Sequence, residues 1–306
     1  MHNIYALGKD IAHSKSPVMH NALYEAVGLD WNYGVMDCAT SEEAREFLAS
    51  RDFLGLNVTM PYKPLAYEVA SVKASTAKLA RGANVLAVKD DNLLAFNVDG
   101  QGFVTYLEST GFSFAGKNVV VCGTGPTSLA TLHAAALAGA NSITLIGRNK
   151  ERAERAITAY LTDFGRLSLA AMGAPASGAH YRSFREAYEE PSFFFGSYQT
   201  STQAITAADL IVDATPCGMH PGDKAPFDTD LLREGHVVFD VVYGHGETAL
   251  VSAARGAGCQ AYDGSGMLVA QAVATAVVLF EVNDVQVSLG TDEMFRIMAD
   301  AAAFEC

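Results

Sequence analysis

The stretch GKNVVVCGTGPTSLATLHAAALAGANSITLIGR, Gly116 to Arg148, decides the fold. An apolar run leads into the glycine loop GTGPTS, a helix-like segment rich in alanine follows, and a second apolar run ends the stretch. This order of strand, loop, helix and strand is a βαβ unit, which predicts parallel strands in a doubly wound α/β sheet.

The glycine loop is typical of a dinucleotide site because it follows a strand and opens a helix. Gly123 permits a tight turn, and Gly125 lets the backbone approach a pyrophosphate beside the helix N-terminus. Ser128 stands where a third small residue is needed, and Pro126 suits the first helical position. We expect Gly123, Gly125, Thr127 and Ser128 to contact a cofactor. The alternative is a purely structural turn between strand and helix.

The end of the next strand, in IGRNKERAERA, indicates which cofactor binds. NAD sites usually place an acid there to bind the ribose 2′-hydroxyl, but this strand ends at Arg148. Asn149 can cap the following helix, and Lys150 and Arg152 in its first turn oppose the helix dipole. A bound 2′-phosphate would relieve that conflict by pairing with both arginines, so the pattern predicts NADP. The alternative is a solvated basic surface.

Composition excludes several classes of protein. The net charge of −13 over 306 residues disfavours nucleic acid and anionic membranes as partners. The longest apolar run, MLVAQAVATAVVLF, contains Gln271, is too short for a membrane span and fits a buried helix. The N-terminus lacks the layout of a signal peptide, which predicts a cytoplasmic protein. The five cysteines form no metal-binding pattern, so we expect reduced thiols and no metal.

Two α/β halves are expected around the βαβ unit. Residues 1–103, completed by 265–306, form one predicted domain, and residues 104–264 form the dinucleotide-binding domain. In the first, strands are expected over HNIYALG, WNYGVMDC and FLGLNVTM, a helix over SEEAREFLAS capped by Ser41, and a hairpin turn at Asp91-Asn92. In the second, ADLIVDATP, HVVFDVVY and CQAYDG read as strands. Residues 164–204 read as an irregular surface excursion.

Two further segments of the first half carry chemistry. In AHSKSPVMHNA, Ser14 and Ser16 alternate, so an extended chain points both hydroxyls the same way, where they could grip a carboxylate. The alternative is that they cap the next helix. In LNVTMPYKP, Lys63 lies between two prolines that would stiffen its loop, and by its spacing alone it reads as a surface lysine.

These segments, with GANVLAV, AFNVDGQGF, VVFDVVY and GSGMLVAQA, resemble shikimate dehydrogenase from Tyr5 to about Phe280. The motifs HSxSP, NVTxPxK and NxDxxG occur in that order. The resemblance implies an open α/β substrate domain, a Rossmann NADP domain and an active site in the cleft between them.

Site residues follow from the resemblance one by one. It implies that Lys63 and Asp99 are the catalytic pair. Residues that match the substrate ligands are Ser14, Ser16 and Tyr243 for the carboxylate, and Thr59, Asn84 and Gln271 for the ring hydroxyls. Besides the glycine loop, Arg148, Asn149 and Arg152, the implied cofactor contacts are Thr215 and Gly264.

The sequence departs from the family in three places. YGHGET follows the tyrosine, with His245 in place of a proline, and we interpret it as a surface loop. Asp213 begins DATPCGM, where the family often has Asn, in a loop that family members place near the nicotinamide. Gly147 and Asn149 differ from the usual residues around Arg148.

The expected function is NADP-dependent, reversible reduction of 3-dehydroshikimate to shikimate in the chorismate pathway of aromatic amino-acid biosynthesis, by a monomer or homodimer. Alternatives are an NAD-using quinate/shikimate dehydrogenase, a metabolite sensor that lacks catalysis, and a generic dinucleotide-binding module. Loss of the lysine or the aspartate would mark a sensor, and both are present.

Overall fold

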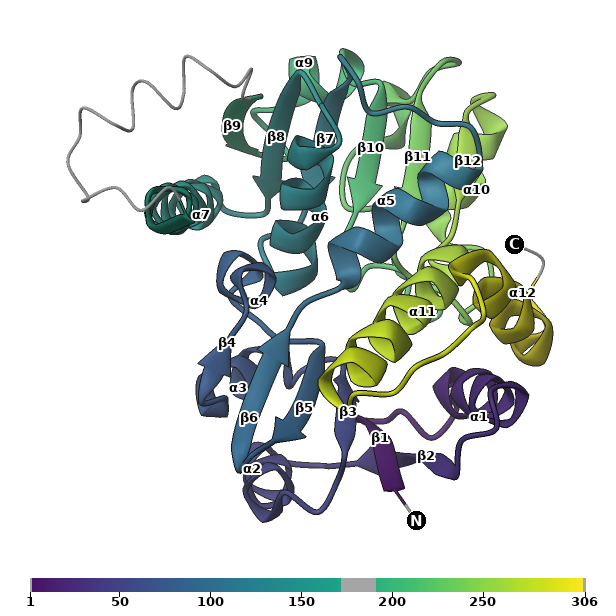
Figure 1. Cartoon of the computed structure of the whole chain (residues 1–306). Helices are drawn as coiled ribbons and strands as arrows, with labels where there is room; N and C mark the ends of the chain where they lie inside the picture. Colours follow the sequence, from purple (N-terminus) through teal and green to yellow (C-terminus); the bar gives the residue numbers. More distant parts are fainter. Residues whose placement is uncertain (1, 172–190, 305–306) are drawn as a thin grey trace. The chain divides into compact units, whose positions relative to one another are not determined.

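The computed structural model describes residues 2–171 and 191–304 (Figure 1). The described residues form two compact units, one up to Tyr106 together with those from Gly266 onward, and the other from Leu107 to Ser265. Each unit contains one six-stranded sheet. The predicted fold class, an open α/β unit and a doubly wound parallel unit, is confirmed. That they serve as substrate and dinucleotide domains stays a prediction.

The first unit is built on a mixed sheet in the order β2-β1-β3-β5-β6-β4. β1, β2 and β3 are parallel, and β5 is antiparallel to both of its neighbours, β3 and β6. Its strands are β1 (His2–Gly8), β2 (Trp31–Asp37), β3 (Gly55–Val58), β4 (Val72–Lys73), β5 (Val85–Lys89) and β6 (Asn92–Phe96). Its helices are α1 (Ser16–Ala26), α2 (Ser41–Ser50), α3 (Lys63–Val69), α4 (Ser75–Ala80), α5 (Asp99–Ser109), α11 (Ser265–Val282) and α12 (Thr291–Ala302), of which α5 runs on past Tyr106 and α11 begins one residue before Gly266.

The strand directions bring several loops to one edge of this sheet. The carboxyl ends of β1, β2, β3 and β6 share that edge, because β6 is antiparallel to β5, which is itself antiparallel to β3. β5 begins at the same edge for the same reason. The segments that contain Ser14, Thr59, Asn84 and Asp99 therefore meet there.

The second unit is an all-parallel sheet in the order β12-β11-β10-β7-β8-β9. Its strands are β7 (Asn118–Cys122), β8 (Ser142–Gly147), β9 (Ser192–Ser197), β10 (Leu210–Asp213), β11 (Val237–Asp240) and β12 (Gln260–Tyr262). Its helices are α6 (Pro126–Leu137), α7 (Lys150–Ala171), α9 (Thr202–Thr206), the 3-10 turn η1 (Thr229–Leu231) and α10 (Ala249–Gly256). The chain order reverses between β7 and β10, and ligands of such sheets bind outside the carboxyl ends of the strands at that point.

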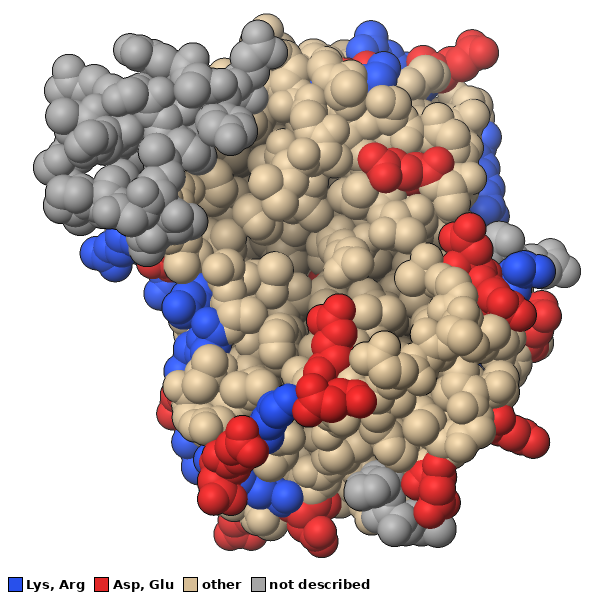
Figure 2. All heavy atoms as spheres, viewed as in Figure 1, with Lys and Arg blue, Asp and Glu red and all other residues tan. Residues whose placement is uncertain are grey.

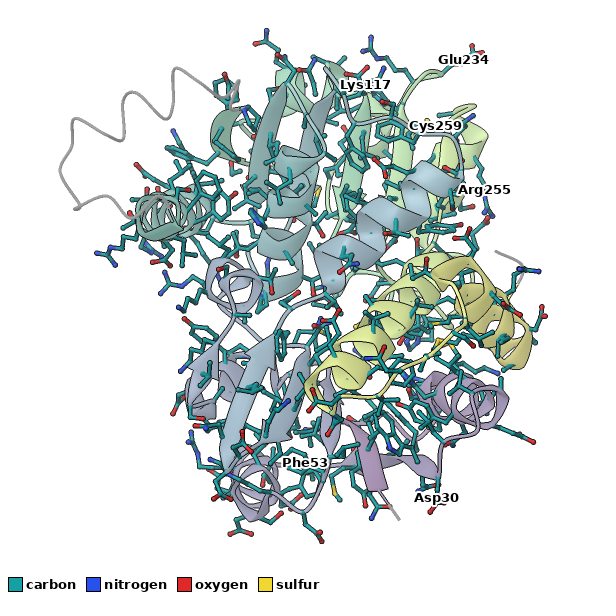
Figure 3. All side chains as sticks on the ribbon, viewed as in Figure 1. Asp30, Phe53, Lys117, Glu234, Arg255 and Cys259 are labelled. Atoms are coloured by element: carbon teal, nitrogen blue, oxygen red, sulfur yellow. The ribbon has the colours of Figure 1, made fainter. Side chains whose placement is uncertain are left out.

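The two ends of the parallel sheet differ in character. Lys117 and Glu234, labelled in Figure 3, precede β7 and β11 and so mark the amino ends of the strands. There Lys117 Nζ lies 3.3 Å from Asp209 Oδ1, in a partly exposed ion pair. The predicted site residues Gly123 and Thr215 follow the opposite, carboxyl ends.

The C-terminal part packs onto the first unit. α12 lies beside α1 (Figure 1). Among the described residues, α11 is the one helix long and apolar enough to cross a membrane, and 72% of it is buried inside the protein. This burial agrees with the prediction of a buried helix over the same residues. Figure 2 shows one face of the molecule, where charged side chains are scattered and uncharged ones cover most of the surface.

Four local predictions need correction. The cap of α2 is Thr40, whose Oγ1 accepts a hydrogen bond from Glu43 N at 3.2 Å, so Ser41 is the first helical residue. The hairpin turn is Asp90-Asp91, both at positive φ, because Lys89 pairs with Asn92. Residues 164–204 are not wholly irregular: α7 runs to residue 171, and β9 and α9 follow. Residues 172–190 lie outside the described residues.

The fourth correction concerns the lysine loop. Lys63 is the first residue of α3 and Pro64 lies in the first turn of that helix, so the lysine is held by a helix start rather than by a stiff loop. The proline still suits that place, because its fixed φ fits a helix and its missing N–H is not needed there. The predicted helix start after the glycine loop is confirmed, since Gly125 is the N-cap of α6 and Pro126 its first residue, whereas cofactor contact by this loop stays a prediction.

Candidate active site

The lysine and the aspartate of the implied catalytic pair are in contact. Lys63 Nζ lies 2.6 Å from Asp99 Oδ2, and the two side chains are 12% and 6% exposed. Lys63 begins α3, about five residues after the end of β3, and Asp99 begins α5, three residues after the end of β6. The two strands end at the same sheet edge, which explains why residues 36 positions apart meet.

Asn84 fixes the other oxygen of that carboxylate. Its Nδ2 donates to Asp99 Oδ1 at 2.8 Å, and its Oδ1 accepts from Val98 N at 2.8 Å. The same Nδ2 lies 3.5 Å from Gln271 Oε1, at the outer limit of a hydrogen bond. Asn84 is 2% exposed. Both ends of its amide are thus engaged by the protein, and it orients Asp99 whatever else it binds.

A second polar chain anchors the helix that carries Gln271. Tyr33 Oη donates to Asn57 Oδ1 at 2.8 Å, and Asn57 Nδ2 donates to Thr275 Oγ1 at 2.8 Å. Thr275 Oγ1 in turn donates to the Gln271 carbonyl oxygen at 2.9 Å. This buried network ties β2 and β3 to α11. Sequence reasoning missed Asn57, although a polar residue inside an otherwise apolar strand is a signal of such a partner.

A glycine lets α5 and α11 approach closely. A Cβ atom on Gly102 would lie 2.7 Å from Gln271 N, closer than real Cβ contacts come. The glycine of NxDxxG therefore has a packing role: it allows the helix that begins with Asp99 to cross the helix that carries Gln271. The sequence offered this residue within a recognised motif, but only the helix crossing gives the reason for it.

The serine segment lies at the same sheet edge. Ser14 Oγ accepts from Ser16 N at 3.2 Å, and Ser14 N donates to Ile11 O at 2.9 Å. Lys15 is the N-cap of α1 and makes no side-chain cap bond, so Ser14 does part of the local capping. Its O–H can still donate, because a hydroxyl accepts and donates at once. The carboxylate-binding and capping roles are compatible.

Neighbouring strands hold that segment in place. Asp37, the last residue of β2, accepts from Asp10 N at 2.8 Å and from Ile11 N at 3.0 Å. A Cβ on Gly8 would lie 2.6 Å from Thr59 Cγ2, so the turn after β1 packs directly on Thr59. Sequence reasoning gave Asp37 no role, and a lone acid at a strand end carries no signal of one.

In the second unit, the glycine loop has the shape that a phosphate site needs. Gly123 has a φ of +109°, and a Cβ there would lie 2.6 Å from Ser128 Oγ. A Cβ on Gly125 would meet no other atom within 4 Å, so the packing of the protein does not require glycine at this position. The open space beside the backbone is what the predicted contact with a pyrophosphate calls for. Thr127 lies in the first turn of α6, beside the loop.

The basic segment after β8 is built as the sequence predicts. Asn149 Oδ1 accepts from Arg152 N at 2.7 Å and so caps α7. Arg148, Asn149 and Arg152 are all exposed. Glu151 in the same turn offsets part of the unfavourable charge at the helix start.

The remaining predicted residues follow β10, β11 and β12. Thr215 comes two residues after β10, and its Oγ1 accepts from Cys217 N at 3.2 Å. Tyr243 follows β11, and a Cβ on Gly264 would collide with the Val241 carbonyl oxygen and lie 3.3 Å from Tyr243 Cδ1. The residues after Tyr243, 244–247, are exposed, as the surface-loop interpretation expects.

Among the residues the structure describes, no group of three or more His, Cys, Asp and Glu is arranged to hold a metal ion. The first unit contains a buried ammonium–carboxylate pair with the amide of Asn84 on it, and the second contains a glycine loop followed, after β8, by exposed arginines. The first suits proton transfer to a polar substrate. The second suits a phosphorylated dinucleotide.

Comparison with known proteins agrees with this chemistry. Residues 6–86 match the family model described as shikimate dehydrogenase substrate binding domain. The NADP(+) shikimate dehydrogenase of Symbiobacterium thermophilum is 34% identical over 87% of this chain and 84% of its own length.

Two solved structures share the fold. That of shikimate 5-dehydrogenase from Thermus thermophilus, in complex with NADP(H) and shikimate, is 22% identical with a TM-score of 0.76, and covers 98% of this chain and 100% of its own. That of quinate dehydrogenase from Corynebacterium glutamicum, in complex with NAD, is 23% identical with a TM-score of 0.74, over 98% and 99%. The fold is thus common to enzymes with either cofactor, and sequence identity over most of both chains settles the kinship. The chain belongs to the shikimate dehydrogenase family.

Proposed function

We propose that the chain catalyses the reversible reduction of 3-dehydroshikimate to shikimate with NADPH. The observation that carries the proposal is the buried Lys63–Asp99 pair, with Asn84 on the second carboxylate oxygen. A protein that only senses a metabolite has no need to keep an ammonium group buried and aligned in this way. The curated relative named above, with 34% identity, supports the same reaction.

Reduction of a ketone requires a hydride on carbon and a proton on oxygen. Bound NADPH would supply the hydride. As the carbonyl π electrons move onto oxygen, the Lys63 ammonium donates a proton to that oxygen, and the lysine amine regains a proton from solvent. In the reverse direction the amine accepts the hydroxyl proton. Asp99 accepts a hydrogen bond from Lys63 Nζ and so holds the ammonium group in one orientation.

Uncharged polar side chains would bind the substrate. Hydroxyl groups that donate to a carboxylate and amides that bind ring hydroxyls orient the ring without adding charge. On this proposal the carboxylate is bound by Ser14, Ser16 and Tyr243, and the ring hydroxyls by Thr59, Asn84 and Gln271. Asn84 would share its amide between Asp99 and the substrate.

The glycine loop and the basic segment would hold NADP. The room beside Gly125 admits a pyrophosphate, and the α6 N-terminus provides a favourable field for it. Arg148 and Arg152 would bind the 2′-phosphate, since the strand before them ends without an acid. The other proposed contacts are Gly123, Thr127, Ser128, Asn149, Thr215 and Gly264.

One assay tests the substrate and the cofactor together. Shikimate and quinate are each offered with NADP and with NAD, and the absorbance of the reduced cofactor is followed. Shikimate with NADP should give the highest kcat/KM. A preference for NAD would instead support the quinate/shikimate alternative, and absence of turnover with all four pairs would contradict the proposal.

A variant tests the role of the lysine. Lys63→Ala should lower kcat by about 10²- to 10⁴-fold, the usual contribution of a general acid. Lys89→Ala is the matched control, because Lys89 forms an exposed ion pair with Asp284 in the same unit, and it should keep wild-type activity. If Lys63→Ala keeps more than about a tenth of the wild-type kcat, Lys63 is not the proton donor.

We further propose that the protein works in the cytoplasm as a monomer or a homodimer. The free Cys38, Cys122 and Cys259 are buried, which suits a reducing compartment. Light scattering coupled to size-exclusion chromatography would decide between monomer and dimer, and a larger mass would contradict both.

A further inference from the structure

Two aspartates end neighbouring strands of the parallel sheet at the same register. Asp213 of β10 pairs with Asp240 of β11, and both are fully buried. Each starts the same kind of turn: Asp213 Oδ1 accepts from Thr215 N at 2.9 Å, and Asp240 Oδ1 accepts from Val242 N at 3.0 Å. The other oxygen differs. Asp240 Oδ2 accepts from Thr248 Oγ1 at 2.7 Å, whereas buried Asp213 Oδ2 has no hydrogen-bond partner in the described structure.

The loop that Asp213 starts, Ala214–Gly218, lies at the point where the strand order reverses. Ala214 N donates to the carbonyl oxygen of Cys122, the last residue of β7. A Cβ on Gly123 would lie 2.9 Å from Ala214 O, so this loop packs directly on the glycine loop. A shift of Ala214 would therefore displace the glycine loop, where the cofactor is proposed to bind.

The surroundings of Asp213 disfavour a negative charge. Burial, and after it the charge of Asp240, raises the pKa of Asp213 to about 8, although the hydrogen bonds to Thr215 act in the opposite direction. Burial also raises the pKa of Asp240, to about 6, against its hydrogen bonds with Thr248 and Val242. Asp240 thus carries the charge first, and Asp213 keeps its proton at neutral pH.

The other ionisable groups that face this pair are themselves acids. Cys122 of β7 is buried, and burial together with Asp213 raises its pKa well above the usual value. Burial likewise raises the pKa of Tyr198, the residue after β9, and both Asp213 and Cys217 add to the effect. Arg148 lowers the pKa of Tyr198 in part. Cys122 and Tyr198 thus share the preference of the pair for the neutral form, and the charge of Asp263 adds to the raised pKa of Asp240.

We propose that Asp213 is a positioning residue that works as a neutral carboxylic acid, and that loss of its proton releases the Ala214–Gly218 loop and weakens cofactor binding. The inference rests on the proposed binding of NADP at this sheet edge. When neutral, Asp213 stays in the sheet and holds Thr215. When ionised, Asp213 adds a second buried charge beside Asp240, and one of its oxygens has no hydrogen-bond partner. The carboxylate can lower this cost by moving toward water, but only if it breaks its hydrogen bond with Thr215 N.

The test is the dissociation constant of NADP⁺, measured by isothermal titration calorimetry at constant ionic strength across neutral and alkaline pH. If binding requires the proton, about a tenth of the molecules remain competent one pH unit above the pKa, so the wild-type constant should rise about tenfold between about pH 7 and pH 9. Asp213→Asn keeps the shape and cannot ionise, so its constant should change much less. Ionisation of NADP⁺ itself is common to all variants and cancels in the ratio.

A second variant separates titration from simple structural damage. Asp240→Asn removes the neighbouring charge, so the loss of affinity should begin at lower pH than in wild type, a shift that a merely structural role would not cause. If Asp213→Asn fails to fold, this shift alone decides the matter. Asp228→Asn is the matched control: Asp228 Oδ1 accepts from Asp230 N in the same kind of turn, but Asp228 is exposed, and its profile should follow wild type.

The outcomes are distinct. A rise with pH that is equal in wild type and Asp213→Asn would overturn the inference, as would an unshifted profile in Asp240→Asn. Failure of wild type to bind NADP⁺ at any pH, in protein that is folded, would overturn the proposed function instead.

Discussion

Replacing Asp99 by Asn should destabilise the first unit as well as abolish most turnover. The substitution keeps the shape of the side chain and an oxygen that can accept from Asn84, but it removes the charge opposite Lys63. The ion pair is short, at 2.6 Å, and both side chains are nearly buried. Asp99→Asn therefore leaves an ammonium group in a place where water reaches it poorly.

The magnitude follows from the geometry. At 2.6 Å and an effective dielectric constant of about 20, the two charges attract by roughly 6 kcal/mol, and desolvation of both groups offsets much of this gain. Removing one partner is the larger effect, because the remaining buried charge is uncompensated, and it costs about 3–5 kcal/mol. Asp99→Asn and Lys63→Met should each lower the free energy of unfolding by that amount. The double variant should lose clearly less free energy of unfolding than the sum of the two single losses, with a coupling energy of about 3 kcal/mol.

Urea denaturation followed by tryptophan fluorescence is a suitable assay. The only tryptophan of the chain, Trp31, lies in β2 of the unit that contains the pair, so the signal reports unfolding of that unit. Asp284→Asn, which breaks the exposed pair with Lys89, serves as the control and should leave the curve unchanged. Strictly additive losses in the double variant would refute the reasoning, because the two side chains would then not interact. Wild-type stability of both single variants would refute the claim that the pair is buried.

Three further predictions concern the serines, the arginines and the second unit. Ser14→Ala and Ser16→Ala should each raise KM for shikimate about tenfold or more with little change in kcat, because a charge-assisted hydrogen bond contributes about 1.5–3 kcal/mol. A fall in kcat alone would contradict carboxylate binding by these serines. The double variant Arg148→Ala/Arg152→Ala should lower kcat/KM with NADP by about 10²-fold and barely affect NAD, measured at one salt concentration; equal losses would mean that the 2′-phosphate is bound elsewhere. The pKa of Asp213 is raised to about 8 from 3.8, so between these pH values the folded state binds more protons than the unfolded state, and the free energy of unfolding should fall as pH rises, by at most about 1.4 kcal/mol per pH unit. Asp213→Asn should flatten this slope. An unchanged slope in denaturation curves of the variant would contradict the prediction.

The fold was largely predictable because its signals are local. A strand, a glycine loop and a helix leave a pattern within 33 residues, Gly116 to Arg148, and the structure forms β7, α6 and β8 from it. Short elements were harder to predict. α3 is only seven residues long and begins at Lys63, between residues that also suit a loop, and the hairpin turn differs by one residue because Asp90, Asp91 and Asn92 are all good turn formers.

The identities of the candidate site residues came from motifs, whereas their working contacts came from the tertiary structure. The sequence places Asn84 and Asp99 on either side of a hairpin, and only the strand register shows that the amide of one holds the carboxylate of the other. The structural roles of Gly102 and Asn57 depend on contacts with distant segments, which no local sequence pattern contains. One allows a helix crossing, and the other joins β3 to a helix more than 200 positions later, through a bond with Thr275.

Asp213 shows how a departure from a family pattern gains meaning from structure. In the sequence it is an acid where an amide is usual, which could mean a change of cofactor, a tolerated surface residue or nothing. The register places it beside Asp240, and burial removes the water that would let both ionise. An amide in the same place would hold the same turn to Thr215 at every pH, so the acid adds only a dependence on protonation. The difference between Asp and Asn at this position is therefore expected to show in how NADP affinity varies with pH rather than in affinity near neutrality.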